Sequence, residues 1–216
     1  MNVRPGTLKD LNAMTDILIA ASPDDPAYDY RFPDRNLYPT VFETVCRQKC
    51  REYLENHYVV VCEFSGYGVV AFSVWDLPSK ARAAASRRHR PSEPSCSCTA
   101  TLARSSVTIG NQARQLKFRK VLADYKKTLD AHYNNHVFLR ILMTHPNYRR
   151  RGAGTKLTEW GVNLARSQRI PTTVFASPMG LKLYEKLGFR KIMKCCVNVK
   201  GDTESLKLPV LVKPPT

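Results

Sequence analysis

The chain has 216 residues, 43% of them hydrophobic and 24% charged, which suits one domain with a sizeable core and excludes wholesale disorder. Its 34 Lys and Arg residues against 18 Asp and Glu give a formal net charge of +16, which attracts anions of many kinds and selects none of them. No stretch reaches the roughly 20 consecutive apolar residues that a membrane-spanning helix needs.

The N-terminal part of the chain predicts a strand, two helices and a hairpin. Residues 1–4 suit a short strand, and Thr7 suits the cap of the helix that follows. Residues 22–39 hold four prolines among several aromatic residues and are expected to form an ordered loop. Apolar residues at helical spacing predict a second helix over 39–55, and two β-branched runs joined by Ser-Gly predict a hairpin over 57–77.

Residues 79–110 differ in composition from the rest of the chain. They are small, polar and basic, and their apolar residues follow no sustained period. We therefore expect a basic, low-complexity insertion that adds little burial to the core and whose removal leaves the melting temperature nearly unchanged.

The C-terminal part alternates helices and strands. We expect helices over 111–133, with Leu116 on its buried side, 155–168 and 179–187, and strands over 136–144, 171–176, 190–199 and 206–212. A strand–helix–strand order implies one parallel crossover, whereas the hairpins are antiparallel. The predicted fold is a single α/β (α+β) domain over residues 1–216, with a mixed, mainly antiparallel sheet of six or seven strands and helices on both faces.

The segment "YRRRGAGTKL", residues 148–157, lies between a predicted strand and the first turn of a helix. Free backbone N–H groups and the helix dipole make such a helix start attractive to anions, and glycines let a phosphate approach the backbone. Neighbouring arginines can add charge-assisted hydrogen bonds. The spacing Arg149-x-x-Gly152-x-Gly154 differs from the P-loop and from the dinucleotide fingerprint. It therefore predicts a pyrophosphate site of another kind, or else an exposed basic turn.

Two longer segments, "LRILMTHPNYRRRGAGTKLTEWGVNLA" and "VFASPMGLKLYEKLGFRKI", resemble the acetyl-CoA-binding half of the GNAT N-acetyltransferase superfamily, and in particular its fungal small-molecule members. The resemblance implies a GNAT-like acyl-CoA N-acyltransferase fold. It also implies transfer of an acetyl group from acetyl-CoA to a primary amine by direct attack in a ternary complex. In this family the sheet opens between the strands predicted here at 136–144 and 171–176.

The same resemblance implies where acetyl-CoA would bind. Main-chain groups of Leu142, Met143 and Thr144 would pair with the pantetheine arm, as an added strand would. The pyrophosphate loop would comprise Arg149, Arg150, Arg151, Gly152, Ala153, Gly154 and Thr155. Ser177 occupies the place where many relatives have an asparagine that contacts CoA. Tyr184 would lie beside the thioester sulfur and protonate the departing thiolate as the catalytic acid.

The general base and the acceptor pocket are less defined by the sequence. The strand before the loop lacks the carboxylate that some relatives use, which leaves Asp25, Asp29, Glu63 or a chain of waters as candidates for the base. The acceptor would contact the segment after the first helix and the hairpin, that is, Tyr28, Tyr30, Phe32, Tyr38 and Trp75. This aromatic set suits an apolar or aromatic amine or, alternatively, pins a loop in place.

Three alternatives to a small-molecule enzyme remain. A protein or histone lysine acetyltransferase shares the chemistry, but a basic protein is a poor match for lysine-rich tails. A protein that binds acyl-CoA without turnover is compatible with the missing strand carboxylate. Nucleic-acid binding would use the positive charge, but the sequence carries no recognition signature for it. The sequence therefore favours a small-molecule amine as the partner and predicts no oligomeric state.

Cysteine usage bears on the compartment and on metals. Seven cysteines, an odd count, favour free thiols in a reducing compartment over a disulfide framework. Cys96-Ser97-Cys98 has no matching pair of metal ligands, so no metal is expected. Because the first residues do not form a secretory leader, we expect no membrane association and a cytoplasmic location, with the nucleus as an alternative.

Overall fold

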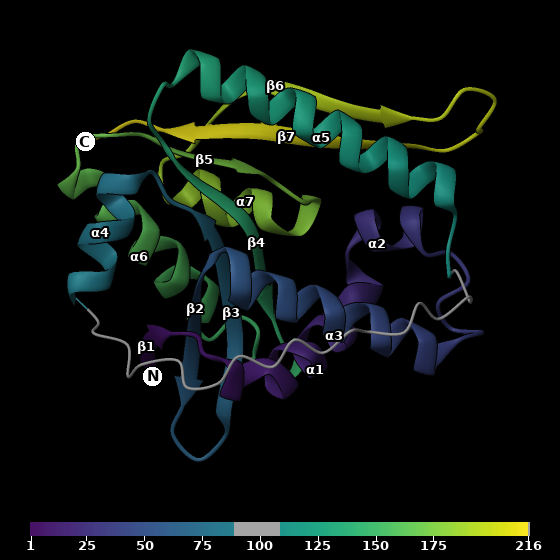
Figure 1. Ribbon diagram of the computed structural model, residues 1–216, viewed down its shortest axis with the longest axis horizontal. Coiled ribbons are helices and arrows are strands. Elements are labelled where there is room, and N and C mark those ends of the chain that lie inside the picture. The colour runs from purple at the N-terminus through teal and green to yellow at the C-terminus, as the bar shows by residue number, and fades with distance from the viewer. Residues whose placement is uncertain (89–108, 216) are drawn as a thin grey trace.

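The computed structural model describes residues 1–88 and 109–215, and these form one seven-stranded sheet in the order β1-β2-β3-β4-β5-β7-β6 (Figure 1). The strands are β1 (Asn2–Pro5), β2 (Tyr58–Phe64), β3 (Gly68–Asp76), β4 (Val137–Thr144), β5 (Thr172–Phe175), β6 (Arg190–Asn198) and β7 (Ser205–Lys213). Every neighbouring pair is antiparallel except β4 and β5. The mixed, mainly antiparallel sheet predicted from the sequence is therefore confirmed.

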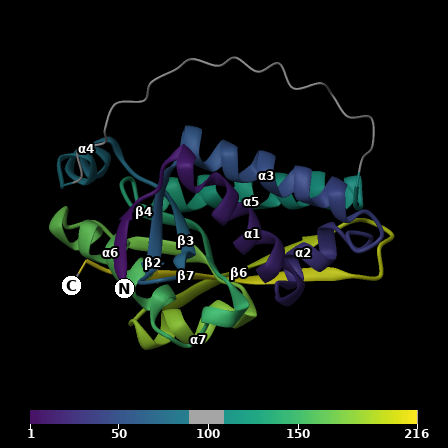
Figure 2. The ribbon, with the colours of Figure 1, turned by 90° about the horizontal axis from the view of Figure 1, so that it is seen from below.

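Helices cover both faces of this sheet. They are α1 (Leu11–Ala21), α2 (Pro26–Arg31), α3 (Pro39–Asn56), α4 (Ser79–Arg88), α5 (Gln112–His132), α6 (Ala153–Ser167) and α7 (Pro178–Lys186), with short 3-10 turns η1 (Leu8–Asp10), η2 (Ser22–Asp24) and η3 (Pro146–Tyr148). Figure 2 shows α1, α3 and α5 on one side of the sheet and α6 and α7 on the other. None of the helices in the described part of the chain is long and apolar enough to cross a membrane.

Two segments that the sequence assigned to irregular structure are partly helical. Within the predicted loop 22–39, Pro26 starts α2, and the Asp25 side chain caps it by accepting a hydrogen bond from the Ala27 N–H. Within the predicted insertion 79–110, residues 79–88 form α4, and its Ala81 and Ala85 are buried in the core cluster that includes α6. That part of the insertion prediction is wrong, because small residues suffice for burial where two elements lie close. Residues 89–108 lie outside the described residues.

In the long helix α5, one of the residues that the sequence predicted to be buried is exposed. Leu116 was expected to be buried but is 65% exposed, whereas Arg114, two residues earlier, pairs with Asp202 beside the β6–β7 hairpin; Leu116 therefore lies on the solvent side of the helix. Leu129, near the other end of α5, is fully buried as predicted. One side of the helix, from Phe118 to Leu129, packs in the cluster that includes Phe138 of β4 and the strands β6 and β7.

The single parallel pair of strands is short, and this positions the site. β4 and β5 pair from Val137 and Thr172 only as far as Leu139 and Val174. Beyond that point β4 continues to Thr144 against β3, while β5 ends at Phe175, and its other edge pairs with β7 along its whole length. The sheet therefore opens between β4 and β5, as the family resemblance implied.

Helix α6 packs closely on the sheet because Gly161 faces the ring of Trp75. Trp75 is fully buried on β3, and its indole Nε1 donates a hydrogen bond of 2.8 Å to the Ser73 hydroxyl. A Cβ atom at Gly161 would overlap the outer edge of the Trp75 ring. Since this ring is fixed by burial and by its hydrogen bond, it has little room to yield.

We expect Gly161→Ala to destabilise the protein even though alanine favours helix by about 1 kcal/mol over glycine. Overpacking a filled core lowers the free energy of unfolding by about 1–3 kcal/mol. Urea unfolding of the variant would measure the change. Adding Trp75→Leu should restore part of the loss, because it removes the atoms that the new methyl meets. A Gly161→Ala variant at least as stable as the parent would contradict this packing.

Candidate active site

A cavity of about 740 Å³ lies where β4 parts from β5. Its floor is formed by residues 138–143 of β4, and its walls come from α1, α2, α3 and α5. At its deep end it reaches Val174 and Phe175 of β5 and then Ser177 and Tyr184 beside and within α7. The opening of the sheet therefore connects the face covered by α3 and α5 with helix α7 on the other face.

The edge of β4 that faces this opening has no strand partner beyond Leu139. Leu142, Met143 and Thr144, the residues predicted to pair with pantetheine, are bound to β3 on their other edge, and the first two line the cavity. An extended molecule in the opening can therefore hydrogen-bond to β4 as a strand would. This geometry fits the predicted pantetheine position, which stays a prediction.

The glycine-rich segment forms the start of α6, just beyond the end of β4. Gly152 has a φ of +88°, in the left-handed region, and caps the helix, which begins at Ala153. Arg150 also has a positive φ of 62°. The chain thus turns sharply at the helix start, with the first-turn N–H groups of Gly154 and Thr155 directed away from the helix body. This is a suitable cradle for a phosphate group.

The arginines of this segment are partly engaged with other residues of the protein. The Arg149 guanidinium forms an ion pair with Asp24, which immediately precedes the α2 cap. The Arg151 guanidinium lies 5.5 Å from the centre of the Tyr148 ring. The sequence predicted both side chains as phosphate ligands, and in this structure each has a protein partner instead. The backbone of the loop is therefore the more available ligand.

Tyr184 meets the requirements of a proton donor better than those of a base. Its ring is 4% exposed, packs at 5.5 Å from Phe189, and lines the cavity. Burial raises the pKa of the Tyr184 hydroxyl well above its usual range, and the charge of Asp25 adds to this rise. The hydroxyl therefore carries its proton throughout the neutral range. Ser177, nearby, caps α7 by accepting a hydrogen bond of 3.2 Å from the Gly180 N–H.

The structure separates the three carboxylates that the sequence offered as a base. Glu63 is bound to Arg4 on the β1–β2 side of the sheet, and Asp29 is exposed and paired with Arg35. Asp25, by contrast, lines the cavity that holds Tyr184. Burial raises the pKa of the Asp25 carboxyl, which the Ala27 N–H in part offsets. Of the three, Asp25 is placed to accept a proton inside the cavity.

The aromatic residues predicted for the acceptor pocket divide in the same way. Tyr28 and Phe32, both in or next to α2, line the cavity. Trp75 does not, because it is buried beneath α6, and Tyr30 does not, because its ring packs with α5 and the β6–β7 pair. Tyr38 is 51% exposed outside the cavity. The prediction for Tyr30 is wrong because residues 28 and 30 lie on different sides of the short helix α2 and therefore face different neighbours.

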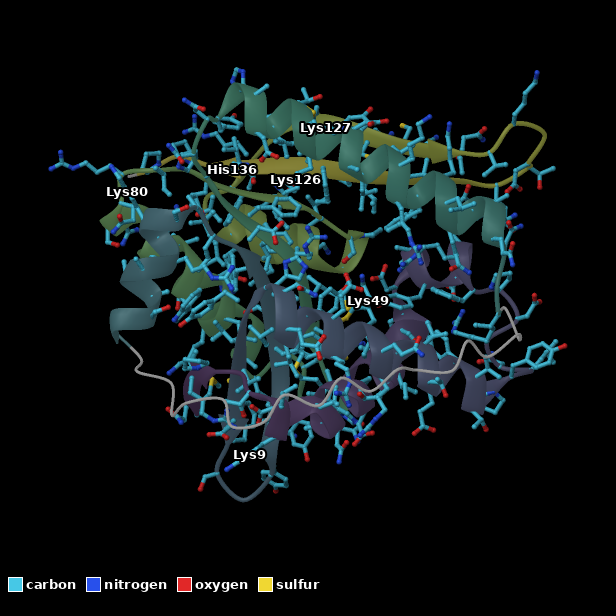
Figure 3. The ribbon with its side chains drawn as sticks, viewed as in Figure 1. Lys9, Lys49, Lys80, Lys126, Lys127 and His136 are labelled. Atoms are coloured by element: carbon cyan, nitrogen blue, oxygen red, sulfur yellow. The ribbon has the colours of Figure 1, made fainter. Side chains whose placement is uncertain are left out.

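Several charged residues of the cavity were missed by sequence reasoning. They are Arg31 of α2, Lys49 and Glu52 of α3, Arg119, Lys126, Lys127 and Asp130 of α5, and Arg140 of β4. Figure 3 shows Lys49 and Lys126 entering the space between α3 and α5. No local signal in the sequence predicts that these side chains line the cavity, because their position depends on α5 crossing over β4.

The described part of the chain does not bring together three His, Cys, Asp or Glu residues that could hold a metal ion.

Comparisons with known proteins agree with this geometry. Residues 121–191 match the acetyltransferase (GNAT) domain family. An acetyltransferase of Stachybotrys chartarum is 31% identical over 87 residues, a match that covers 40% of this chain and 38% of that relative. Mosquito arylalkylamine N-acetyltransferase-like 5b has a TM-score of 0.63 at 19% identity over 99% of both chains. The structure of yncA from Salmonella typhimurium, with its cofactor acetyl-CoA, has a TM-score of 0.53 at 16% identity over 100% of this chain and 94% of that one.

Proposed function

Since the chain belongs to the GNAT superfamily of acetyltransferases, we propose that it is an acetyl-CoA-dependent N-acetyltransferase that acts on the primary amine of a small molecule. The observation that carries the proposal is the cavity at the opening between β4 and β5, because it brings an unpaired strand edge, the partly buried carboxylate of Asp25 and the buried phenol of Tyr184 together. The strand edge suits an amide-containing arm, and the two side chains suit proton transfer.

The residues present fit acetyl-CoA as the co-substrate. The pantetheine arm carries amide groups that the edge of β4 can bind, and the pyrophosphate carries negative charge that the start of α6 can bind. When bound, acetyl-CoA supplies an acetyl group activated as a thioester. Leu142 and Met143 would then orient this arm toward Tyr184.

Two residues of the chain would move the protons that acetyl transfer requires. An alkyl amine has a pKa near ~10, so it is mostly protonated at neutral pH and must lose a proton before or during attack. Asp25 would accept that proton at its carboxylate, and burial brings its pKa closer to the working pH, which suits a base. The Tyr184 hydroxyl would give its proton to the departing thiolate.

The aromatic walls support an aromatic or apolar acceptor over a lysine-rich peptide. Tyr28 and Phe32 face the cavity, and a protein of the same fold is an arylalkylamine N-acetyltransferase-like protein. The test is a panel of small amines and lysine peptides incubated with acetyl-CoA, with release of the free CoA thiol as the readout. Amine-stimulated release supports the proposal. Release with peptides alone would indicate a protein acetyltransferase, and acetyl-CoA binding without release would indicate a non-catalytic protein.

We expect Gly154→Val to abolish most acetyl-CoA binding while the protein still folds. A Cβ atom here would lie 3.4 Å from Leu183 Cδ2, an ordinary contact, and Gly154 has no left-handed backbone that valine could not adopt. The larger side chain would instead cover N–H groups of the helix start, and losing two charge-assisted hydrogen bonds weakens binding by about 100-fold or more.

Calorimetry with acetyl-CoA would measure this loss, and circular dichroism would confirm the fold. Arg150→Ala is the matched comparison and should weaken binding less, since it removes one side chain and leaves the backbone accessible. A Gly154→Val variant that folds and binds acetyl-CoA as tightly as the parent would show that the start of α6 is only a basic turn.

A further inference from the structure

Arg31 stands out among the charged residues of the cavity because aromatic rings hold its guanidinium. Its carbon Cζ lies 4.5 Å from the centre of the Tyr28 ring and 4.3 Å from the centre of the Phe118 ring, which belongs to α5. Its Nε donates a hydrogen bond of 2.6 Å to the Ala27 carbonyl, one turn earlier in α2. The side chain is therefore fixed in position, and its remaining N–H donors are left for another molecule.

Arg31 also lacks the carboxylate partner that comparable arginines have. Arg35 pairs with Asp29, Arg114 with Asp202 and Glu204, and Arg140 with Asp76. Within residues 1–88 and 109–215, no carboxylate lies within 4.0 Å of the Arg31 guanidinium. A half-buried cation that makes no ion pair is unfavourable unless a ligand supplies the counter-charge.

The balance of charge around the cavity points in the same direction. Its described lining holds six cationic and three anionic side chains, namely Arg31, Lys49, Arg119, Lys126, Lys127 and Arg140 against Asp25, Glu52 and Asp130. Lys49 pairs with Glu52 and Lys126 with Asp130, while Arg140 pairs with an aspartate outside the lining. Asp25 is then the carboxylate of the lining without an ion pair, and it faces an excess of positive charge.

We propose that the acceptor is an amine that also carries a carboxylate, with an aromatic body between the two charged groups. Arg31 would bind the carboxylate, because a guanidinium offers two parallel donors that match its two oxygens. Asp25, which caps the N-terminal end of α2 and lines the same cavity, would receive the amine. Tyr28, Phe32 and Phe118 line the same cavity and offer apolar contacts for the ring. This inference rests on the proposed function and specifies its substrate class.

The test uses matched pairs of acceptors that differ by a carboxylate on the far side of the ring: 4-(2-aminoethyl)benzoate with 2-phenylethylamine, and 4-(aminomethyl)benzoate with benzylamine. With the parent protein, kcat/KM should be higher for the carboxylated member of at least one pair by about 10- to 100-fold, the value of one charge-assisted interaction. Arg31→Gln should remove that preference, because it lowers kcat/KM for the carboxylated member far more than for the plain amine. Arg31→Lys, which keeps the charge but not the paired donors, should keep part of it.

The control is Arg47→Gln, because Arg47 lies on α3, is exposed and does not line the cavity. It removes the same charge and should leave the preference unchanged. The inference is overturned if the parent acetylates the plain amines as well as the carboxylated ones, or if Arg31→Gln slows both members equally; the proposed function survives either result. If no amine is acetylated at all, the proposed function fails and the inference falls with it. Melting curves and acetyl-CoA binding, both expected to be unchanged in Arg31→Gln, exclude loss of the fold.

Discussion

Asp25→Asn should lower kcat/KM for the amine acceptor by about 10²- to 10⁴-fold, the range that a positioned general base contributes. Asparagine keeps the size of the side chain and can still cap α2 by accepting the Ala27 hydrogen bond. It cannot accept a proton. The protein should therefore fold and bind acetyl-CoA normally while turnover is lost, and steady-state kinetics paired with calorimetry would show this separation.

The pH dependence gives a second readout of the same residue. Burial raises the pKa of the Asp25 carboxyl, so the parent should lose activity as the pH falls through that raised value, where the carboxylate becomes protonated. This acidic decline should be absent from the residual activity of Asp25→Asn. Asp29→Asn is the matched control, because Asp29 lies on the same helix but pairs with Arg35 outside the cavity. Equal losses in the two variants would remove Asp25 from the mechanism.

Tyr184→Phe should reduce kcat by about 10²- to 10⁴-fold if the hydroxyl protonates the leaving thiolate. The ring and its packing on Phe189 remain, so the dissociation constant for acetyl-CoA and the melting temperature should change little. Rapid-quench measurements of acetyl transfer, made alongside binding, would place the defect in the chemical step.

The pH profile of the parent offers an independent check on Tyr184. Because burial raises the pKa of this hydroxyl well above its usual range, the acid should stay protonated, and no alkaline decline from it is expected below about pH 10. Tyr125→Phe is a suitable control, since Tyr125 bonds to the Lys194 carbonyl and does not line the cavity. Full activity in Tyr184→Phe would leave the residue with a packing role.

The half of the site on α6 and α7 was predictable because its signals are local. Gly152 is needed where the backbone takes a positive φ, and Ser177 caps α7 through an atom three residues away. Such features follow from a few consecutive residues, whatever the rest of the chain does. The opening of the sheet was also predicted, but through the family resemblance and not through any property of β4 itself.

The acceptor half of the site was not predictable, because its residues become neighbours only through tertiary packing. Arg31 and Phe118 are separated by a long stretch of chain and meet because α5 crosses above α2 and β4. Tryptophan is a residue type that often lines binding sites, and only the position of α6 shows that Trp75 belongs to the core. Asp25 could be chosen over Asp29 and Glu63 only after each had been placed on its own side of the fold.

The early parting of β4 from β5 also links ligand binding to the thermal stability of the protein. Backbone groups of β4 beyond Leu139 must be hydrated on their open edge in the free protein, whereas a bound chain would pair with them. The unfolded polypeptide has no such edge, so a ligand that completes it binds the folded state alone. At 100 times its dissociation constant, such a ligand adds about 2.7 kcal/mol to the unfolding free energy. The melting temperature should therefore rise with the logarithm of acetyl-CoA concentration. The opening in the sheet thus makes the stability of the folded protein depend on how much co-substrate is present.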